Sequence, residues 1–166
     1  MITNEDLTIL SNSIVKGCRE ISWKLTTAES CTGGIISAAI TSVSGSSKIF
    51  DQGFIVYSDE AKSTSLEISS ALINIHGAVS STIAKEMALA ALKKTNADIS
   101  IAVTGIAGPE GGTKEKPVGL IYLAIGVKNQ IEKIIELRLS GTRDQIRLET
   151  AKISLEQCLE SISNNA

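Results

Sequence analysis

The chain has 166 residues, of which 43% are hydrophobic, and a formal net charge of −2 at pH 7. This size suits one domain with a substantial core, and the charge lacks the basic excess of a nucleic-acid-binding protein. The longest apolar runs, such as 120–127, are too short to cross a bilayer, and residues 1–6 lack a signal-peptide core. We therefore expect a single cytoplasmic domain over 1–166 that contacts neither nucleic acid nor membrane.

The first half of the chain alternates between helical periodicity and short β-branched runs. A helix with an apolar stripe is expected from a cap at Asn4 to about Glu20, and a strand follows over 24–28. The next elements are a helix that ends near Ser42, a strand within 50–57, and a short helix that is capped by Ser58 or Asp59 and contains Lys62.

The second half is expected to hold two helices, a strand, a long glycine-rich loop, a hairpin and a final helix. The helices are a short one over 69–75 and a stronger one capped by Ser80 or Ser81. The strand covers 99–103, and the loop covers 104–113. A strand over 118–127 then turns into an alternating one, whose Ile131, Ile135, Leu137 and Leu139 are expected on one face of an antiparallel hairpin.

The last helix is expected to begin with a capping box of Thr142 and Gln145, and 161–166 are expected to fray. Strands that alternate with helices, followed by a hairpin, are typical of a mixed sheet covered on both faces. The sequence therefore predicts a three-layer α/β/α domain with a mixed sheet.

The three cysteines form no CxxC pair and are odd in number, so we expect neither a disulfide framework nor a metal site. Cys18 and Cys158 fall at apolar positions of expected helices and are interpreted as core residues. Cys31 differs, because it adjoins Ser30 and is a rival nucleophile. The single histidine, His76, has apolar neighbours and is interpreted as a structural turn residue.

Ser30 lies in the segment 27–34, at a tight junction between an expected strand and an expected helix. Such a junction lifts a side chain clear of the sheet, and the first N–H groups of the new helix suit an oxyanion or a phosphate. Two interpretations stay open. Either Ser30 is a nucleophile, or Ser30 or Thr32 merely caps the helix while the glycines allow close packing.

A serine nucleophile needs a base, and a single histidine in this setting argues against a Ser-His-Asp triad. Lys62 is the remaining candidate, because a partly desolvated lysine can be neutral near physiological pH. Tyr57 ends the preceding strand at the same sheet edge, so its phenol could relay the proton or orient the hydroxyl. The alternatives are a solvated helix residue for Lys62 and an anchoring aromatic for Tyr57.

The glycine-rich loop over 105–113 could bind an anion through its backbone N–H groups. It lacks the residue order of a P-loop, and no dinucleotide-binding glycine fingerprint follows the first strand. Arg143, at the start of the last helix, could join the helix dipole in binding a phosphate, or it could be an ordinary surface arginine.

Five segments together resemble the CinA carboxyl-terminal domain family, the nicotinamide-nucleotide amidases. These segments are TAESCTGG at 27–34, YSDEAK at 57–62, HGAVS at 76–80, TGIAGPEGG at 104–112 and KPVG at 116–119. They cover nearly the whole chain in the family's order. The resemblance implies hydrolysis of the carboxamide of nicotinamide mononucleotide to nicotinate mononucleotide and ammonia, without a metal or another cofactor.

The resemblance also implies roles for particular residues. Ser30 is the expected nucleophile, and Tyr57 and Lys62 complete the catalytic site. Beyond the resemblance, our mechanistic hypothesis is that the N–H groups near Cys31, Thr32 and Gly33 stabilise the oxyanion and that the phosphate contacts Thr104, Gly105 and Arg143. The family usually has asparagine where this chain has Asp59, and a carboxylate there could strengthen the helix cap or raise the pKa of Lys62.

Larger relatives carry an amino-terminal domain with nucleotide pyrophosphatase activity, so we expect a stand-alone amidase without that activity. The resemblance further implies a homo-oligomer.

Two alternatives to an amidase remain. One is a catalytically silent nucleotide-binding module of the same fold. The other is a reductase with Tyr57 and Lys62 as proton donors, although their interval is five residues rather than four and the glycine fingerprint is absent.

Overall fold

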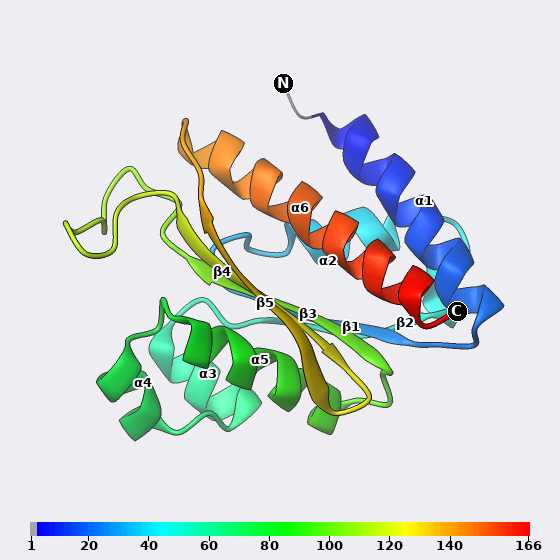
Figure 1. Ribbon diagram of the computed structural model, residues 1–166, viewed down its shortest axis with the longest axis horizontal. Helices are drawn as coiled ribbons and strands as arrows, with labels where there is room; N and C mark the ends of the chain where they lie inside the picture. Colours follow the sequence, from blue (N-terminus) through cyan, green and yellow to red (C-terminus); the bar gives the residue numbers. More distant parts are fainter. Residues whose placement is uncertain (1–2) are drawn as a thin grey trace.

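A five-stranded sheet separates two layers of helices in the computed structural model, which describes residues 3–166 (Figure 1). The strand order is β2-β1-β3-β4-β5, with β1 parallel to both β2 and β3, and β4 antiparallel to β3 and β5. The strands are β1 (Leu25–Glu29), β2 (Phe50–Ile55), β3 (Ile99–Gly105), β4 (Leu120–Val127) and β5 (Gln130–Arg138). This arrangement confirms the predicted three-layer α/β/α domain with a mixed sheet.

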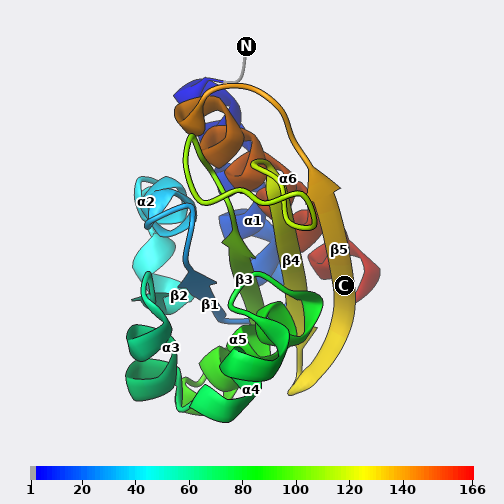
Figure 2. The ribbon, with the colours of Figure 1, turned by 90° about the vertical axis from the view of Figure 1, so that its left-hand side faces the viewer.

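One layer of helices lies on each face of the sheet (Figures 1 and 2). One layer holds α1 (Asn4–Glu20), α2 (Ile35–Thr41) and α6 (Arg143–Asn164). The other holds α3 (Asp59–Leu66), α4 (Ser70–His76) and α5 (Ser81–Lys94). A 3₁₀ turn at Ser46–Lys48 links α2 to β2. Within residues 3–166, no helix has the length and apolar content that a bilayer crossing requires.

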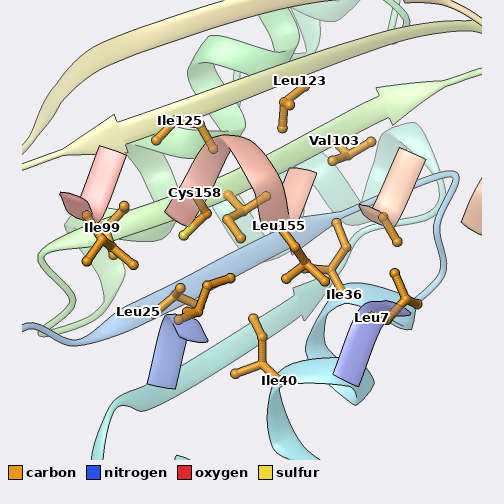
Figure 3. Packing of buried hydrophobic residues seen from close by; sticks show 14 of the residues in the cluster. Leu7, Leu25, Ile36, Ile40, Ile99, Val103, Leu123, Ile125, Leu155 and Cys158 are labelled. Carbon is orange, nitrogen blue, oxygen red and sulfur yellow. The ribbon is translucent and has the colours of Figure 1, made fainter. Parts of the chain in front are cut away.

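The larger core cluster lies between the sheet and the layer of α1, α2 and α6 (Figure 3). Leu25 and Ile99 of the sheet meet Ile36 of α2 and Leu155 of α6 in this cluster, and all four are fully buried. Each such side chain contributes about 1.5–3 kcal/mol through burial. The central strands are covered on both faces, which explains their nearly continuous apolar sequences.

Several helices begin where side-chain caps were expected. Ser58 caps α3 by accepting a hydrogen bond from the Ala61 N–H at 3.0 Å. At α6, Thr142 and Gln145 form the predicted capping box. The cap of α1 is Thr3 rather than Asn4, because the Thr3 hydroxyl accepts from the N–H of Asp6.

The expectation that all four apolar residues of the last strand share one face is wrong, because a bulge interrupts β5. Ile131 pairs with Gly126, whereas the next pair joins Lys133 to Ile125, so Glu132 is an extra residue. Ile131 therefore packs with the α3–α5 layer, and the other three apolar residues pack with the opposite layer.

The expectation of a frayed tail is also wrong for most of 161–166. Helix α6 continues to Asn164, and Ser161 and Ile162 are buried. A Cβ on Gly17 of α1 would lie 2.9 Å from the Ile162 side chain, so the absent side chain at Gly17 permits this close contact of α1 and α6.

Candidate active site

A pocket of about 250 Å³ lies at the carboxyl end of β1, where the chain leaves for β2 on one side and β3 lies on the other. Ligands bind at such switch points because the connecting helices lie on opposite faces and leave a crevice. The loop between β3 and β4 lies beside the start of α6 at this edge (Figures 1 and 2). The lining residues are Ser30, Cys31, Tyr57, Asp59, Lys62, Ala78, Val79, 104–108, Glu110, Gly111 and Arg143.

Ser30 and Lys62 are in direct contact at the base of this pocket. The Lys62 Nζ lies 3.3 Å from the Ser30 Oγ, 3.2 Å from the Val56 carbonyl oxygen and 3.5 Å from the Ser58 carbonyl oxygen. Lys62 is only 1% exposed, although it was open to interpretation as a solvated helix residue. Ser58 starts α3, so Lys62 falls one turn into the helix as the sequence predicted.

Burial lowers the pKa of Lys62 below its ordinary value of 10.5. The Asp59 carboxylate, 3.8 Å from Nζ, opposes this change by favouring the charged ammonium. A neutral amine has two N–H donors and one lone pair. If the two donors face the carbonyls of Val56 and Ser58, the lone pair faces Ser30, and Lys62 can accept the hydroxyl proton.

Tyr57 contacts Arg143 rather than the Ser30–Lys62 pair. Its hydroxyl oxygen accepts a hydrogen bond from Arg143 Nη2 at 2.6 Å, and Arg143 Nη1 donates to the Gly108 carbonyl at 2.7 Å. Across residues 3–166, the Tyr57 hydroxyl forms no other side-chain hydrogen bond. Arg143 thus joins α6 both to the glycine-rich loop and to Tyr57, which precedes α3, at the pocket wall.

The Glu29 carboxylate, which is fully buried, fixes the turn that follows Ser30. Its Oε2 accepts from the Thr32 hydroxyl and from the N–H groups of Gly34 and Ile36, at 2.7–3.1 Å. Its Oε1 accepts from both the N–H and the hydroxyl of Ser37. The amino terminus of α2 is therefore occupied by an internal carboxylate, and this part of the helix is not available to a phosphate.

The remaining N–H groups of this turn can also be accounted for. The Gly33 N–H donates to the Ser30 carbonyl at 3.0 Å, and the Ile35 N–H donates to the Thr32 carbonyl at 3.4 Å. Within the described chain, the N–H groups of Cys31 and Thr32 donate to no oxygen, and both lie beside the Cys31 sulfur, a weak acceptor. These two donors follow Ser30 in the chain, and Cys31 lines the pocket beside it, so they are the candidates for an oxyanion hole.

The other candidate residues occupy different places. Burial raises the pKa of the Cys31 thiol to about 12, which disfavours the nucleophilic thiolate. The Thr104 hydroxyl donates to the Ala78 carbonyl at 2.8 Å, so its proton is already engaged. A Cβ on Gly105 would collide with Ile121 of β4.

Seven of the nine candidate site residues line the pocket, whereas Thr32 and Gly33 lie outside the lining. The Thr32 side chain points to Glu29 and is fully buried. His76 also lies outside the lining, at the last position of α4.

The sequence did not indicate that Glu29, Glu110 and Arg147 lie at the site, where Glu110 lines the pocket and Glu29 and Arg147 bind the turn after Ser30. The one available signal was an acidic residue at the end of a buried strand directly before a helix, at Glu29. Nothing local in the sequence connects Arg147 with the turn that it contacts.

The fold and the pocket define a three-layer α/β/α domain with a serine and a buried lysine at the sheet's switch point. A family model described as the CinA C-terminal domain matches residues 7–162. The chain therefore belongs to the CinA C-terminal domain family, as the resemblance indicated.

Individual relatives agree with this assignment. The chain is 41% identical over 156 residues to the nicotinamide-nucleotide amidohydrolase PncC of Enterobacter agglomerans, covering 94% of this chain and 95% of that protein. It is 45% identical over 162 residues to a CinA-like protein of Prochlorococcus marinus strain MIT 9515, covering 97% of this chain and 37% of that relative. The chain likewise spans 36–38% of the length of curated relatives from two Caldicellulosiruptor species.

A solved structure is also similar. The crystal structure of the competence/damage inducible protein CihA from Agrobacterium tumefaciens superimposes with a TM-score of 0.91 at 39% identity. The match covers 95% of this chain and 96% of that one.

Proposed function

We propose that this domain hydrolyses the carboxamide of nicotinamide mononucleotide to nicotinate mononucleotide and ammonia, with Ser30 as the nucleophile and Lys62 as its base. The observation that carries the proposal is the 3.3 Å contact between the buried Lys62 Nζ and the Ser30 Oγ. The name of the Enterobacter agglomerans relative, a nicotinamide-nucleotide amidohydrolase, supports the choice of substrate.

In the first step, the hydroxyl proton of Ser30 moves to the neutral Lys62 amine while Oγ bonds to the carboxamide carbon. The electron pair of the C=O π bond moves to oxygen, and the N–H groups of Cys31 and Thr32 stabilise the resulting oxyanion. The Lys62 ammonium then gives its proton to the departing nitrogen. The C–N bond breaks, ammonia leaves, and the nicotinoyl group remains as an ester of Ser30.

In the second step, water hydrolyses this ester. Neutral Lys62 takes a proton from water as the water oxygen bonds to the ester carbon. The second tetrahedral intermediate collapses, and Ser30 leaves with the proton from Lys62. The carboxylic acid product then loses its proton to ammonia.

The part of the pocket that Arg143 lines suits the nucleotide phosphate. Arg143 presents a guanidinium that is already oriented by Tyr57 and by the Gly108 carbonyl. Hydrogen bonds to charged groups contribute about 1.5–3 kcal/mol each. Because the proton of the Thr104 hydroxyl is engaged, Thr104 and Gly105 contribute the shape of the phosphate end rather than donated side-chain hydrogen bonds.

The Tyr57–Arg143 contact also argues against the reductase alternative. In that alternative, Tyr57 and Lys62 would act together as proton donors. Here the Tyr57 hydroxyl is bonded to Arg143, and the Lys62 amine is turned toward Ser30.

The experiment compares nicotinamide mononucleotide, nicotinamide riboside and nicotinamide as substrates, with ammonia and the pyridine product both quantified. We expect equal amounts of ammonia and nicotinate mononucleotide from the nucleotide. For the riboside we expect kcat/KM to be about 10- to 100-fold lower, from the loss of one charged contact. Arg143→Met should reduce the difference in kcat/KM between the nucleotide and the riboside. Absence of ammonia from all three compounds would overturn the proposal and favour a silent binding module.

A further inference from the structure

Arg147 donates hydrogen bonds to the backbone of the turn that follows Ser30. It lies one helical turn after Arg143 in α6, and its side chain reaches two consecutive carbonyl groups. Nε donates to the Cys31 carbonyl at 3.2 Å, and Nη2 donates to the Thr32 carbonyl at 3.0 Å. Its third nitrogen, Nη1, lies 3.7 Å from an oxygen of the exposed Asp144. Its strong contacts are therefore made to peptide oxygens.

These contacts determine the direction of a peptide N–H group. The Cys31 carbonyl and the Thr32 N–H belong to the same peptide unit, which is planar, with the two groups pointing in opposite directions. By holding the carbonyl oxygen, Arg147 also fixes the direction of the Thr32 N–H, which points the opposite way within the same plane. Donation to the oxygen also polarises the unit and strengthens its N–H as a donor.

The neighbouring units are fixed as well. The Thr32 carbonyl shares its unit with the Gly33 N–H, which donates to the Ser30 carbonyl at 3.0 Å. On the other side of the turn, the Glu29 carboxylate takes the next helix donors. Arg147 thus binds two carbonyl groups of the turn, and Glu29 binds the N–H groups that follow it. Within residues 3–166, the N–H groups of Cys31 and Thr32 donate to no oxygen and have only the weak acceptor of the Cys31 sulfur beside them.

We propose that Arg147 is a positioning residue that aims and polarises the Thr32 N–H at the oxyanion formed during attack by Ser30. This inference rests on the proposed serine mechanism, but it does not depend on which amide is the substrate. The guanidinium charge behind the peptide unit also favours the negative charge that develops in the transition state.

Gly33 makes this contact possible. A Cβ at Gly33 would lie 3.2 Å from Arg147 Nη2, a tight contact, and the residue has a φ of +60°, which glycine adopts without strain. A side chain at this position would push the guanidinium away from the two carbonyl oxygens. Gly33→Ala is thus a second way to disturb the same contact without changing Arg147.

The test uses Arg147→Ala and Arg147→Lys, with Asp144→Asn as the matched control. The control removes the exposed partner of Arg147 but leaves both carbonyl contacts in place. Two rates are measured on folded protein: phosphonylation of Ser30 by a small fluorophosphonate, followed by intact mass, and ammonia release from nicotinamide mononucleotide. The first rate reports the oxyanion site even if the natural substrate is another amide.

We expect Arg147→Ala to lower both the phosphonylation rate and kcat by about 10- to 100-fold, somewhat less than the 10²–10³ typical of a lost oxyanion donor. KM should change by less than about threefold, and the pH dependence should keep its position, since Lys62 is untouched. Millimolar ethylguanidine should restore part of the rate, Arg147→Lys should be intermediate, and Asp144→Asn should resemble the parent. Gly33→Ala should also lower the phosphonylation rate.

The inference is overturned if folded Arg147→Ala is phosphonylated as fast as the parent, or if only KM changes. It is also overturned if the parent does not react at Ser30. If the parent is phosphonylated but releases no ammonia from the nucleotide, the proposed substrate is wrong, while a slower reaction of Arg147→Ala would still support the positioning role.

Discussion

Ser30 and Lys62 are 32 positions apart in the chain, yet the Ser30 Oγ and the Lys62 Nζ lie 3.3 Å apart. Parallel pairing of β1 and β2 creates this proximity, and the Val56 N–H extends it by donating to the Glu29 carbonyl at 2.9 Å. Ser58 then starts α3 immediately, so one helical turn brings Lys62 under the serine. One strand pairing and one helix cap are therefore sufficient to assemble the pair.

Lys62→Met should slow the reaction strongly and stabilise the fold. Loss of the base should lower kcat by at least about 10². A buried ammonium costs desolvation energy, so the apolar variant should be more stable at pH 7 by about 1 kcal/mol, or a rise of about 2–4 °C in Tm. Thermal unfolding followed at several pH values checks this expectation.

The difference in stability between Lys62→Met and the parent should depend on pH with a defined sign. The folded-state pKa of Lys62 is lowered, so the native state gives up the proton before the unfolded state does as pH rises. The stability of the parent should therefore rise between the lowered pKa and 10.5, and the advantage of Lys62→Met should shrink over the same interval. If the greater stability of Lys62→Met stays constant between the lowered pKa and 10.5, the conclusion that burial desolvates Lys62 is wrong.

Asp59→Asn should move the pH profile of kcat/KM. The Asp59 carboxylate favours the charged form of Lys62, so its removal should lower the pKa of the base further. The rising limb of the profile should then shift to lower pH. Glu60→Gln is the matched control, because it removes an equal charge from the same first turn of α3. Equal shifts in both variants would show a general charge effect instead.

Tyr57→Phe should affect binding more than chemistry. Lys62 contacts Ser30 directly, whereas the Tyr57 hydroxyl is bonded to Arg143. We expect kcat to fall by less than about tenfold and KM for the nucleotide to rise, since Arg143 loses a partner that orients it. Steady-state kinetics distinguish a binding role from a catalytic role for Tyr57. A kcat of Tyr57→Phe as low as that of Lys62→Met would make Tyr57 an obligatory proton relay.

Glu29→Gln should destabilise the fold and slow the reaction. The carboxylate accepts five hydrogen bonds in a buried site, and the amide NH₂ of glutamine would face donors rather than acceptors. We expect a loss of about 3 kcal/mol in the free energy of unfolding, measured by urea denaturation. Glu20→Gln, at an exposed helix pair, should cost less than about 0.5 kcal/mol. Similar losses in both variants would contradict the role given to Glu29.

The parts of the fold that depend on local signals could be predicted from the sequence. The cap at Ser58, the capping box at Thr142 and the β4–β5 hairpin each follow from residues that are close in the chain. The bulge at Glu132 could not be predicted, because an extra residue leaves the alternating pattern almost unchanged while it reverses the facing of Ile131.

In the candidate site, too, local features could be predicted from the sequence and contacts between distant segments could not. The junction at Ser30 and the place of Lys62 in α3 follow from the sequence, whereas their contact depends on strand order. The hydrogen bonds of Arg147 to a turn 115 and 116 positions away depend on how α6 packs across the sheet. Sequence reasoning also treated α2 as an open anion site, because it could not show that Glu29 folds back onto it.

The most direct measurement is the initial rate of ammonia release from nicotinamide mononucleotide by the parent, Ser30→Ala and Cys31→Ala at pH 8. Burial keeps the Cys31 thiol protonated at this pH, with a pKa of about 12, so Cys31→Ala should retain most of the parent's rate. Ser30→Ala should lose the rate while it remains folded. Release by Ser30→Ala equal to that of the parent, or its loss in Cys31→Ala alone, would contradict the assignment of Ser30 as the nucleophile.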